Sequence, residues 1–259
     1  MTAPLELFVF PWGVYPRRVL LYLAEKGLAG HPHIKITQVD VANQMSAPGK
    51  PPGSVPVLRL PDGTFVKQSV AILEYIEDVC DAPDPSQPWQ ADLAAAAAAA
   101  TTVTGSMRGG DTAARRARAR EILALADEAN SHFGLAAHKG ARVFVGAEET
   151  DPKAARLAME YCRKAMGLLE PYYADDELPL LERGGRGVTI VDCVVFSLIS
   201  FARGLYDVDL CSGPAGEELP SLRRFAEWFG KRESARLPEG EFYPAPIKEL
   251  TVFIPENEE

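Results

Sequence analysis

The chain has 259 residues, of which 47% are apolar and 24% charged, and its net charge at pH 7 is −9. This composition is typical of a globular protein that buries a core, as one large domain or two ordinary ones. It argues against non-specific binding to nucleic acids or anionic membranes, and no apolar run approaches the roughly 20 residues of a membrane span.

The first eighty residues predict a strand, a helix, a second strand, a hairpin and a second helix. Pro16 suits the first turn of the first helix, Gly27 suits its C-terminal stop, and Ser69 is predicted to cap the second helix. The hydrophobic patterns that predict these elements span residues 5–10, 16–27, 34–40, 55–67 and 69–78.

A linker and an alanine tract follow. Residues 81–88 contain three prolines and predict a linker between domains. Seven alanines precede a stretch of polar residues and glycines, and residues 91–111 show no amphipathic face. We therefore expect residues 91–111 to form an inserted loop; the alternative is a helix interrupted at Gly109 and Gly110.

The remaining chain predicts an all-helical region. Helical patterns cover residues 113–137 and 151–173, and the very apolar segment 193–205 predicts the core helix. Thr189 and Asp192 have the spacing of a capping box at its start, and residues 238–255 predict an extended surface segment. In the second helix we expect five side chains to be buried: Leu157, Met159, Tyr161, Met166 and Leu168.

The four cysteines indicate the type of compartment. They are scattered along the chain, with no spacing typical of a zinc site or a disulfide framework. We therefore expect buried, inert thiols in a reducing cytoplasm, and the sequence supports no metal site.

Several motifs occur together in one order. Ser54-Val-Pro-Val57 opens the hairpin, Gln68-Ser69 opens a helix, and Leu23-Ala-Glu-Lys-Gly27 ends the first helix. With the proline-rich linker and the Thr189-Ile-Val-Asp192 cap, this order resembles cytosolic glutathione S-transferases over nearly the whole chain. The resemblance implies an α/β thioredoxin-like N-terminal domain followed by an all-α C-terminal domain. The implied divisions are residues 1–82, the linker and insert 83–111, and residues 112–259.

The resemblance implies glutathione as co-substrate and names its contacts. Val55, before a cis Pro56, would pair with the cysteinyl backbone like an added strand. Gln68 and Ser69, at a helix N-terminus, would bind the γ-glutamyl carboxylate, and Lys50 would pair with the glycine carboxylate. The alternatives are that Ser69 only caps its helix, that Gln68 and Lys50 only face solvent, and that Pro56 is trans.

The catalytic position departs from the family pattern. Gly13, fourteen residues before Gly27, occupies the position of the usual Ser or Cys, and Val9 and Phe10 occupy that of the usual Tyr. Tyr15 occupies a position where some fungal members have Asn. Its hydroxyl would donate to the glutathione thiolate; the alternative donors are the backbone N–H groups of Gly13 and Val14.

The implied activity is addition of glutathione sulfur to a hydrophobic electrophile. Trp12 and His132 would line the electrophile's pocket, although a lone helical histidine, such as His132 or His138, is usually a surface residue. The absence of a Cys at position 13 argues against thiol–disulfide chemistry. The family implies a homodimer, and the cysteine pattern, the charge and the composition predict a cytoplasmic protein that binds neither nucleic acid nor membrane. The alternatives are a non-catalytic glutathione-binding or regulatory protein, and a pathway-dedicated enzyme that forms carbon–sulfur bonds or cleaves ethers.

Overall fold

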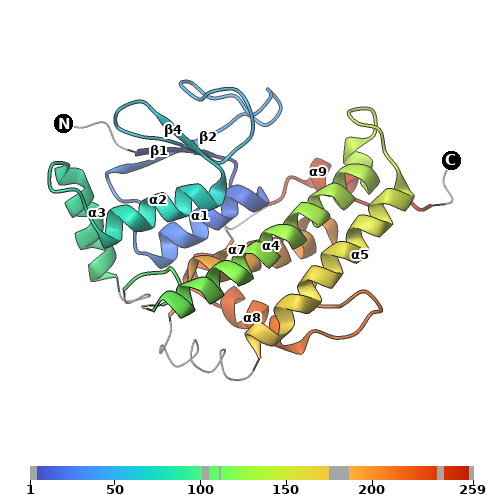
Figure 1. Cartoon of the computed structure of the whole chain (residues 1–259). Coiled ribbons are helices and arrows are strands. Elements are labelled where there is room, and N and C mark those ends of the chain that lie inside the picture. Colours follow the sequence, from blue (N-terminus) through green and yellow to red (C-terminus); the bar gives the residue numbers. More distant parts are fainter. Residues whose placement is uncertain (1–4, 101–104, 111, 175–186, 238–241, 257–259) are drawn as a thin grey trace. The chain divides into compact units, whose positions relative to one another are not determined.

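A small mixed sheet forms the centre of the N-terminal part of the chain. The structure, a computed structural model, describes residues 5–100, 105–110, 112–174, 187–237 and 242–256. It divides into two compact units, Met1–Arg116 with Arg186–Cys193, and Ala117–Gly185 with Val194–Glu259. The sheet belongs to the first unit (Figure 1).

The sheet has the strand order β2-β1-β3-β4. β1 pairs with β2 in parallel and with β3 in antiparallel orientation, and β3 pairs with β4 in antiparallel orientation. All five residues of the central strand β1 are buried, which accounts for its continuous apolar character. Helices α1 and α2 run along the sheet, as expected for a thioredoxin-like domain (Figure 1). The elements are β1 (Leu5–Val9), α1 (Val14–Glu25), β2 (Ile34–Gln38), β3 (Val57–Arg59), β4 (Phe65–Lys67) and α2 (Ser69–Asp81).

A buried polar network joins α1 to α2. The carboxylate of Glu77, on α2, accepts hydrogen bonds from the Tyr22 hydroxyl at 2.5 Å and the Lys26 ammonium at 2.8 Å, both on α1. It also accepts from the backbone N–H of Met107 at 2.6 Å. Burial, with the negative charge of Glu77, raises the pKa of Tyr22 well above 10.0. The network therefore fixes the two helices to each other through fully satisfied buried groups.

The alanine tract is helical, so the prediction of a loop from residue 91 is wrong. Helix α3 (Pro88–Ala99) packs against α2 and buries Trp89, Leu93 and Ala97. Their spacing of four residues places them on one face of a helix, and alanine has the highest helix propensity. The alternative interruption at Gly109 and Gly110 is also wrong, because the helix ends at Ala99. Residues 101–104 and 111 of the predicted insert lie outside the described residues.

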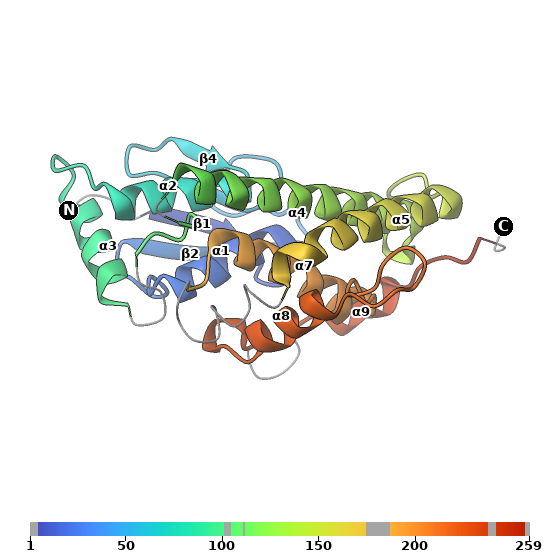
Figure 2. The ribbon, with the colours of Figure 1, turned by 60° about the horizontal axis from the view of Figure 1, so that its bottom comes forward.

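The described residues of the second unit are mainly helical. Helices α4 and α5 lie side by side in two views (Figures 1 and 2). α7 is the most apolar helix, and its residues up to Cys193 belong to the first unit. It begins with the predicted capping box, in which the Thr189 N–H donates to the Asp192 carboxylate at 2.8 Å. The helices are α4 (Ala113–Gly140), α5 (Pro152–Leu169), α7 (Ile190–Tyr206), α8 (Pro220–Gly230) and α9 (Ala245–Leu250), with 3-10 turns at Arg142–Phe144, Glu170–Tyr173 and Glu233–Ala235.

Two predictions for this part of the chain are wrong. On α5, Leu157, Tyr161 and Leu168 are each about half exposed rather than buried. The helix packs instead through mostly small side chains, which allow close approach to its neighbours: Ala155, Ala158, Cys162, Ala165, Met166 and Leu169. The predicted extended segment 238–255 contains helix α9, which begins with a proline in its first turn.

The cysteines have the surroundings of structural thiols. None of the four forms a disulfide, and Cys162, Cys193 and Cys211 are buried as predicted, whereas Cys80 is half-buried. Burial raises the pKa of Cys162 and of Cys211 to about 12, so both stay protonated at neutral pH. None of the described helices combines the length and the apolar character needed to cross a membrane.

Candidate glutathione site

The predicted glutathione contacts lie on three segments of the first unit. The β1–α1 turn carries residues 12–15, the segment before β3 carries residues 50–56, and the start of α2 carries Gln68 and Ser69. The Phe10 ring connects the first two segments, since it packs against the cluster that contains Val55 and lies against Gly13. The structure thus brings the β1–α1 turn and Val55 to one place.

Close packing explains the glycine at position 13. A Cβ atom on Gly13 would lie 2.1 Å from Cε2 of the Phe10 ring, much closer than two carbon atoms can approach. The Phe10 ring in turn packs on Trp12, with centroids 4.6 Å apart. A Ser or Cys side chain at position 13 would therefore require this ring to move.

Several hydrogen-bond donors of the turn remain available. The N–H of Gly13 already donates to the Phe10 carbonyl at 3.2 Å. The N–H groups of Val14 and Tyr15 begin α1 and have no acceptor among the described residues. The Tyr15 side chain is 39% exposed, and its hydroxyl makes no hydrogen bond within the described part of the chain. The available donors are therefore the Tyr15 hydroxyl and the amides of Val14 and Tyr15.

Val55 presents an unpaired backbone next to a packed side chain. The Val55–Pro56 peptide bond is cis, as the family resemblance implied. The Val55 side chain belongs to a buried cluster with Phe8, Val39 and Val57. Neither its N–H nor its C=O has a hydrogen-bond partner among the residues described here. An extended peptide can therefore pair with Val55 as an added strand does.

The start of α2 has free amides and an unusual backbone. Gln68 holds the N-cap position at φ 73° and ψ 125°, a conformation that non-glycine residues rarely adopt and that is concentrated at functional sites. No side chain caps the first turn, so its N–H groups face outward and favour an anion. The prediction that Ser69 is the cap is wrong, because Ser69 is already the first helical residue.

Arg18, which the sequence did not single out, lies between the turn and α2. Its side chain is almost fully buried, and its Nη1 donates to the Ser69 hydroxyl at 3.3 Å. Its Cζ lies 4.9 Å from the centroid of the Tyr15 ring, within the range of a cation–π contact. One buried cation therefore contacts both Tyr15 and Ser69. The signal for it was its spacing of three and four residues from Leu21 and Tyr22 on the buried face of α1.

Lys50 is held by its own loop. Its ammonium donates to the carbonyls of Pro51 at 3.0 Å and Gly53 at 2.6 Å, and no described carboxylate pairs with it. Partial burial and the positive charge of Lys67 lower the pKa of Lys50. An anionic group at this place would relieve the repulsion between the two lysines, which is consistent with the predicted carboxylate contact.

His132 and His138, the two histidines of α4, lie in the second unit and have ordinary helix-surface surroundings. The ring of His132 stacks on Tyr161 with centroids 5.4 Å apart, and that of His138 stacks on Phe144 at 3.9 Å. The role of His132 in an electrophile pocket stays a prediction. Within the described residues, no three His, Cys, Asp or Glu side chains are grouped in a way that could hold a metal ion.

The comparisons with known proteins agree with this fold. Residues 12–79 match the family model of the glutathione S-transferase N-terminal domain. No curated protein matches the sequence. Among solved structures, a glutathione S-transferase domain-containing protein of Marinobacter aquaeolei VT8 is similar, at 19% identity and a TM-score of 0.63, over 89% of this chain and 100% of that chain.

Two further structures are equally similar in fold. Gtt2 of Saccharomyces cerevisiae has 20% identity and a TM-score of 0.61, over 89% of this chain and 98% of its own. A glutathione transferase family member of Pseudomonas fluorescens Pf-5, solved with bound glutathione, has 19% identity and a TM-score of 0.61, over 89% of this chain and 96% of its own. Residues 12–79 thus match the glutathione S-transferase N-terminal domain, and the thioredoxin-like sheet followed by a helical C-terminal part is the fold of these structures.

Proposed function

We propose that the protein is a glutathione transferase-like enzyme that adds the glutathione sulfur to a hydrophobic electrophile. The observation that carries the proposal is the link from Tyr15 through the buried Arg18 to Ser69. A buried cation between two hydroxyl donors suits a ligand that carries negative charge on both a carboxylate and a sulfur. Glutathione-bound relatives of the same fold support the choice of ligand.

The binding step follows from the open backbone groups. The γ-glutamyl carboxylate would bind at the start of α2, to the amides of its first turn, the Ser69 hydroxyl and the side chain of Gln68. The cysteinyl N–H and C=O would pair with Val55 beside Pro56, and the glycine carboxylate would face Lys50. These contacts would leave the thiol at the β1–α1 turn.

The chemical step needs a stabilised thiolate. The Tyr15 hydroxyl, or the Val14 amide in its place, would donate a hydrogen bond to the sulfur, and the start of α1 and the charge of Arg18 would favour its anionic form. The thiol proton would pass to solvent. The sulfur lone pair would then form a carbon–sulfur bond, while the electrophile releases its leaving group or accepts the electron pair and then a proton.

The proposal also covers the two domains, the pocket for the second substrate and the active form of the protein. Residues 1–82 would form the glutathione-binding domain, and residues 112–259 the domain that supplies the second substrate's pocket. Trp12 and His132 would contribute to that pocket, and an apolar lining would suit a hydrophobic electrophile. The active form would be a cytoplasmic homodimer.

A non-catalytic glutathione-binding protein is the second candidate. The observation in its favour is the glycine at position 13, whose Cβ space is filled by Phe10. Such a protein would bind glutathione through the same groups without ionising its thiol.

Calorimetry and spectroscopy distinguish these candidates. We expect saturable glutathione binding and activity with at least one class in a panel of aryl halides, epoxides and α,β-unsaturated carbonyls. Binding without a thiolate band and without turnover would support the non-catalytic protein. No binding of glutathione would contradict both.

A further inference from the structure

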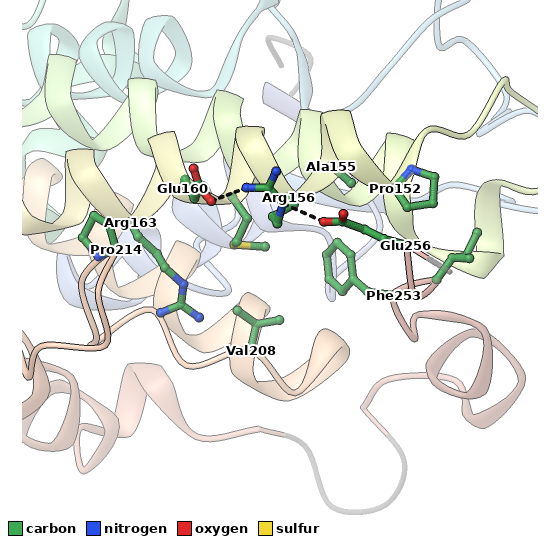
Figure 3. A pocket seen from close by; sticks show the side chains of 11 residues that line it. Pro152, Ala155, Arg156, Glu160, Arg163, Val208, Pro214, Phe253 and Glu256 are labelled. Carbon is green, nitrogen blue, oxygen red and sulfur yellow. Dashed lines mark hydrogen bonds and ion pairs between the residues drawn. The ribbon is translucent and has the colours of Figure 1, made fainter. Parts of the chain in front are cut away.

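A hollow of about 430 Å³ lies in the second unit, on one face of α5 (Figure 3). Residues at helical spacing along α5 form one side of it, the segment after α7 forms another, and the C-terminal residues 253–256 form the third. This volume is within the range of small-molecule sites. Its lining consists of Pro152, Ala155, Arg156, Met159, Glu160, Arg163, Val208, Pro214, Phe253, Ile254 and Glu256.

The walls of the hollow are fixed by hydrogen bonds. The Ile254 N–H donates to the Gly140 carbonyl at 2.7 Å, and the Arg142 N–H donates to the Val252 carbonyl at 3.1 Å. Phe253 pairs with Ala141 in an isolated β-bridge. The C-terminal wall is therefore tied to the end of α4, so the hollow exists without a ligand.

Arg163 presents an oriented guanidinium with one unused edge. Its Nη1 donates to the carbonyls of Asp209 and Ser212, both at 2.9 Å, and to the Ser212 hydroxyl. Its Nε and Nη2 have no acceptor, and no carboxylate pairs with it, within the part of the chain that the structure describes. Nε and Nη2 together form the fork that binds a carboxylate through two hydrogen bonds. The turn thus immobilises the guanidinium and leaves that fork free.

The second arginine of the hollow is already neutralised. Arg156 donates from Nε to Glu256 at 2.6 Å and from Nη1 to Glu160 at 2.5 Å, as the dashed lines in Figure 3 show. These two carboxylates raise the pKa of Arg156. An incoming anion would gain nothing from Arg156, so it would be drawn to Arg163 at the other side of the hollow.

We propose that this hollow is a binding site for a small monocarboxylate with an apolar body. The carboxylate would pair with the Nε–Nη2 fork of Arg163, and the apolar body would lie against Met159, Val208 and Phe253. A dicarboxylate is disfavoured because its second charge would meet Glu160 and Glu256. The site is built from the second unit alone, so it is independent of the proposed glutathione chemistry.

Octanoate is a suitable probe, with 1-octanol as the uncharged analogue of the same chain length. We expect calorimetry of the full chain to give one octanoate site with a Kd below about 1 mM, and clearly weaker binding of octanol. Saturating glutathione should leave the octanoate affinity unchanged. Arg163→Gln should weaken octanoate by about tenfold or more, because the charged fork is lost. Lys164→Gln is the matched control, since it removes one positive charge from the adjacent, exposed position of α5.

A second variant is needed because Arg163→Gln also removes the hydrogen bonds from Arg163 to the turn at residues 209–212. Val208→Phe narrows the hollow and keeps Arg163, so it should also weaken octanoate binding while the melting temperature stays close to that of the wild type. Absence of binding, equal affinity for octanol, displacement by glutathione, or full affinity in both pocket variants would each overturn the proposal.

Discussion

The two halves of the proposed glutathione site differ in the kind of chemical group that they use, backbone groups in one and side chains in the other. The anchoring half, Val55 and the start of α2, uses mainly backbone groups, which are set by the β-sheet and by a helix end. The thiol half, residues 10–15, depends on single side chains, and there the chain has Gly13 where the family resemblance implies a Ser or Cys. Backbone anchoring tolerates sequence change, whereas thiol activation does not. Variants should therefore affect glutathione affinity and thiol ionisation separately.

The largest effect, on the free energy of unfolding, is expected from a change in the buried network that joins α1 to α2, because these two helices carry parts of both halves of the site. Glu77→Gln leaves the buried Lys26 ammonium without its ion-pair partner, which typically costs about 3–5 kcal/mol. Denaturant unfolding should show this loss in the free energy of unfolding. Adding Lys26→Met should recover part of it, because no buried charge then remains. If Glu77→Gln alone were as stable as the wild type, the network would not hold α1 to α2.

Arg18→Met should disturb both halves at once. It removes the hydrogen bond to Ser69 and the contact with the Tyr15 ring, so we expect a loss of about 2–4 kcal/mol in transition-state stabilisation. Both the KM for glutathione and the thiol pKa should rise. Arg18→Lys, which keeps the charge, should recover the pKa more than the KM. A change in only one of the two quantities would contradict the bridging role of Arg18.

Ser69→Ala should affect the anchoring half alone. Loss of a hydrogen bond to a carboxylate should weaken glutathione binding by about 1–3 kcal/mol in calorimetry. The thiol pKa of bound glutathione should stay unchanged. An unchanged affinity would leave Ser69 as a structural partner of Arg18 only.

Tyr15→Phe should affect the thiol half alone. The ring and its contact with Arg18 remain, but the hydroxyl is lost, so the pKa of the bound thiol should rise by about one unit, equivalent to 1.4 kcal/mol. The measurement is the pH dependence of the thiolate absorbance. Superimposable curves for the two proteins would give the donor role to the Val14 amide.

Glu6→Gln tests a contribution to the stability of the fold from strand β1, outside both halves of the glutathione site. Burial would raise the pKa of Glu6, but hydrogen bonds from Lys35 and Thr37 and the charge of Arg59 lower it below 4.5. A lowered pKa stabilises the fold above pH 4.5, and this stabilisation disappears as the pH falls through the lowered value. We expect the variant to lose about 1 kcal/mol at pH 7 and to show a flatter acid dependence in unfolding experiments. An equal loss at pH 3 would contradict the assignment.

The sequence predicted the elements whose signals are local. Strand, helix and hairpin order, the Thr189–Asp192 cap and the cis Pro56 followed from periodicity, capping chemistry and family resemblance. Helix α3 was missed because its buried face consists of Trp89, Leu93 and a single alanine, which a hydrophobic pattern does not distinguish from the alanines around it.

The missed parts of the site depend on contacts between distant residues. Arg18 and Ser69 are 51 positions apart in the sequence but are hydrogen-bonded in the structure. The glycine at position 13 is explained by the position of the Phe10 ring, which the sequence does not show. On α5, a pattern of large apolar residues suggested the wrong buried face, because the packing uses small side chains. Such contacts follow from the three-dimensional arrangement and have no periodic signature.

We propose that this chain binds glutathione and ionises its thiol without a Ser, Cys or Tyr at the usual positions. The most direct test is the ultraviolet difference spectrum of the wild-type protein with saturating glutathione near pH 7, with occupancy measured by calorimetry. We predict a thiolate band at a pH where free glutathione, with a thiol pKa near 8.5, is mostly protonated. Full occupancy by glutathione without that band would contradict the claim.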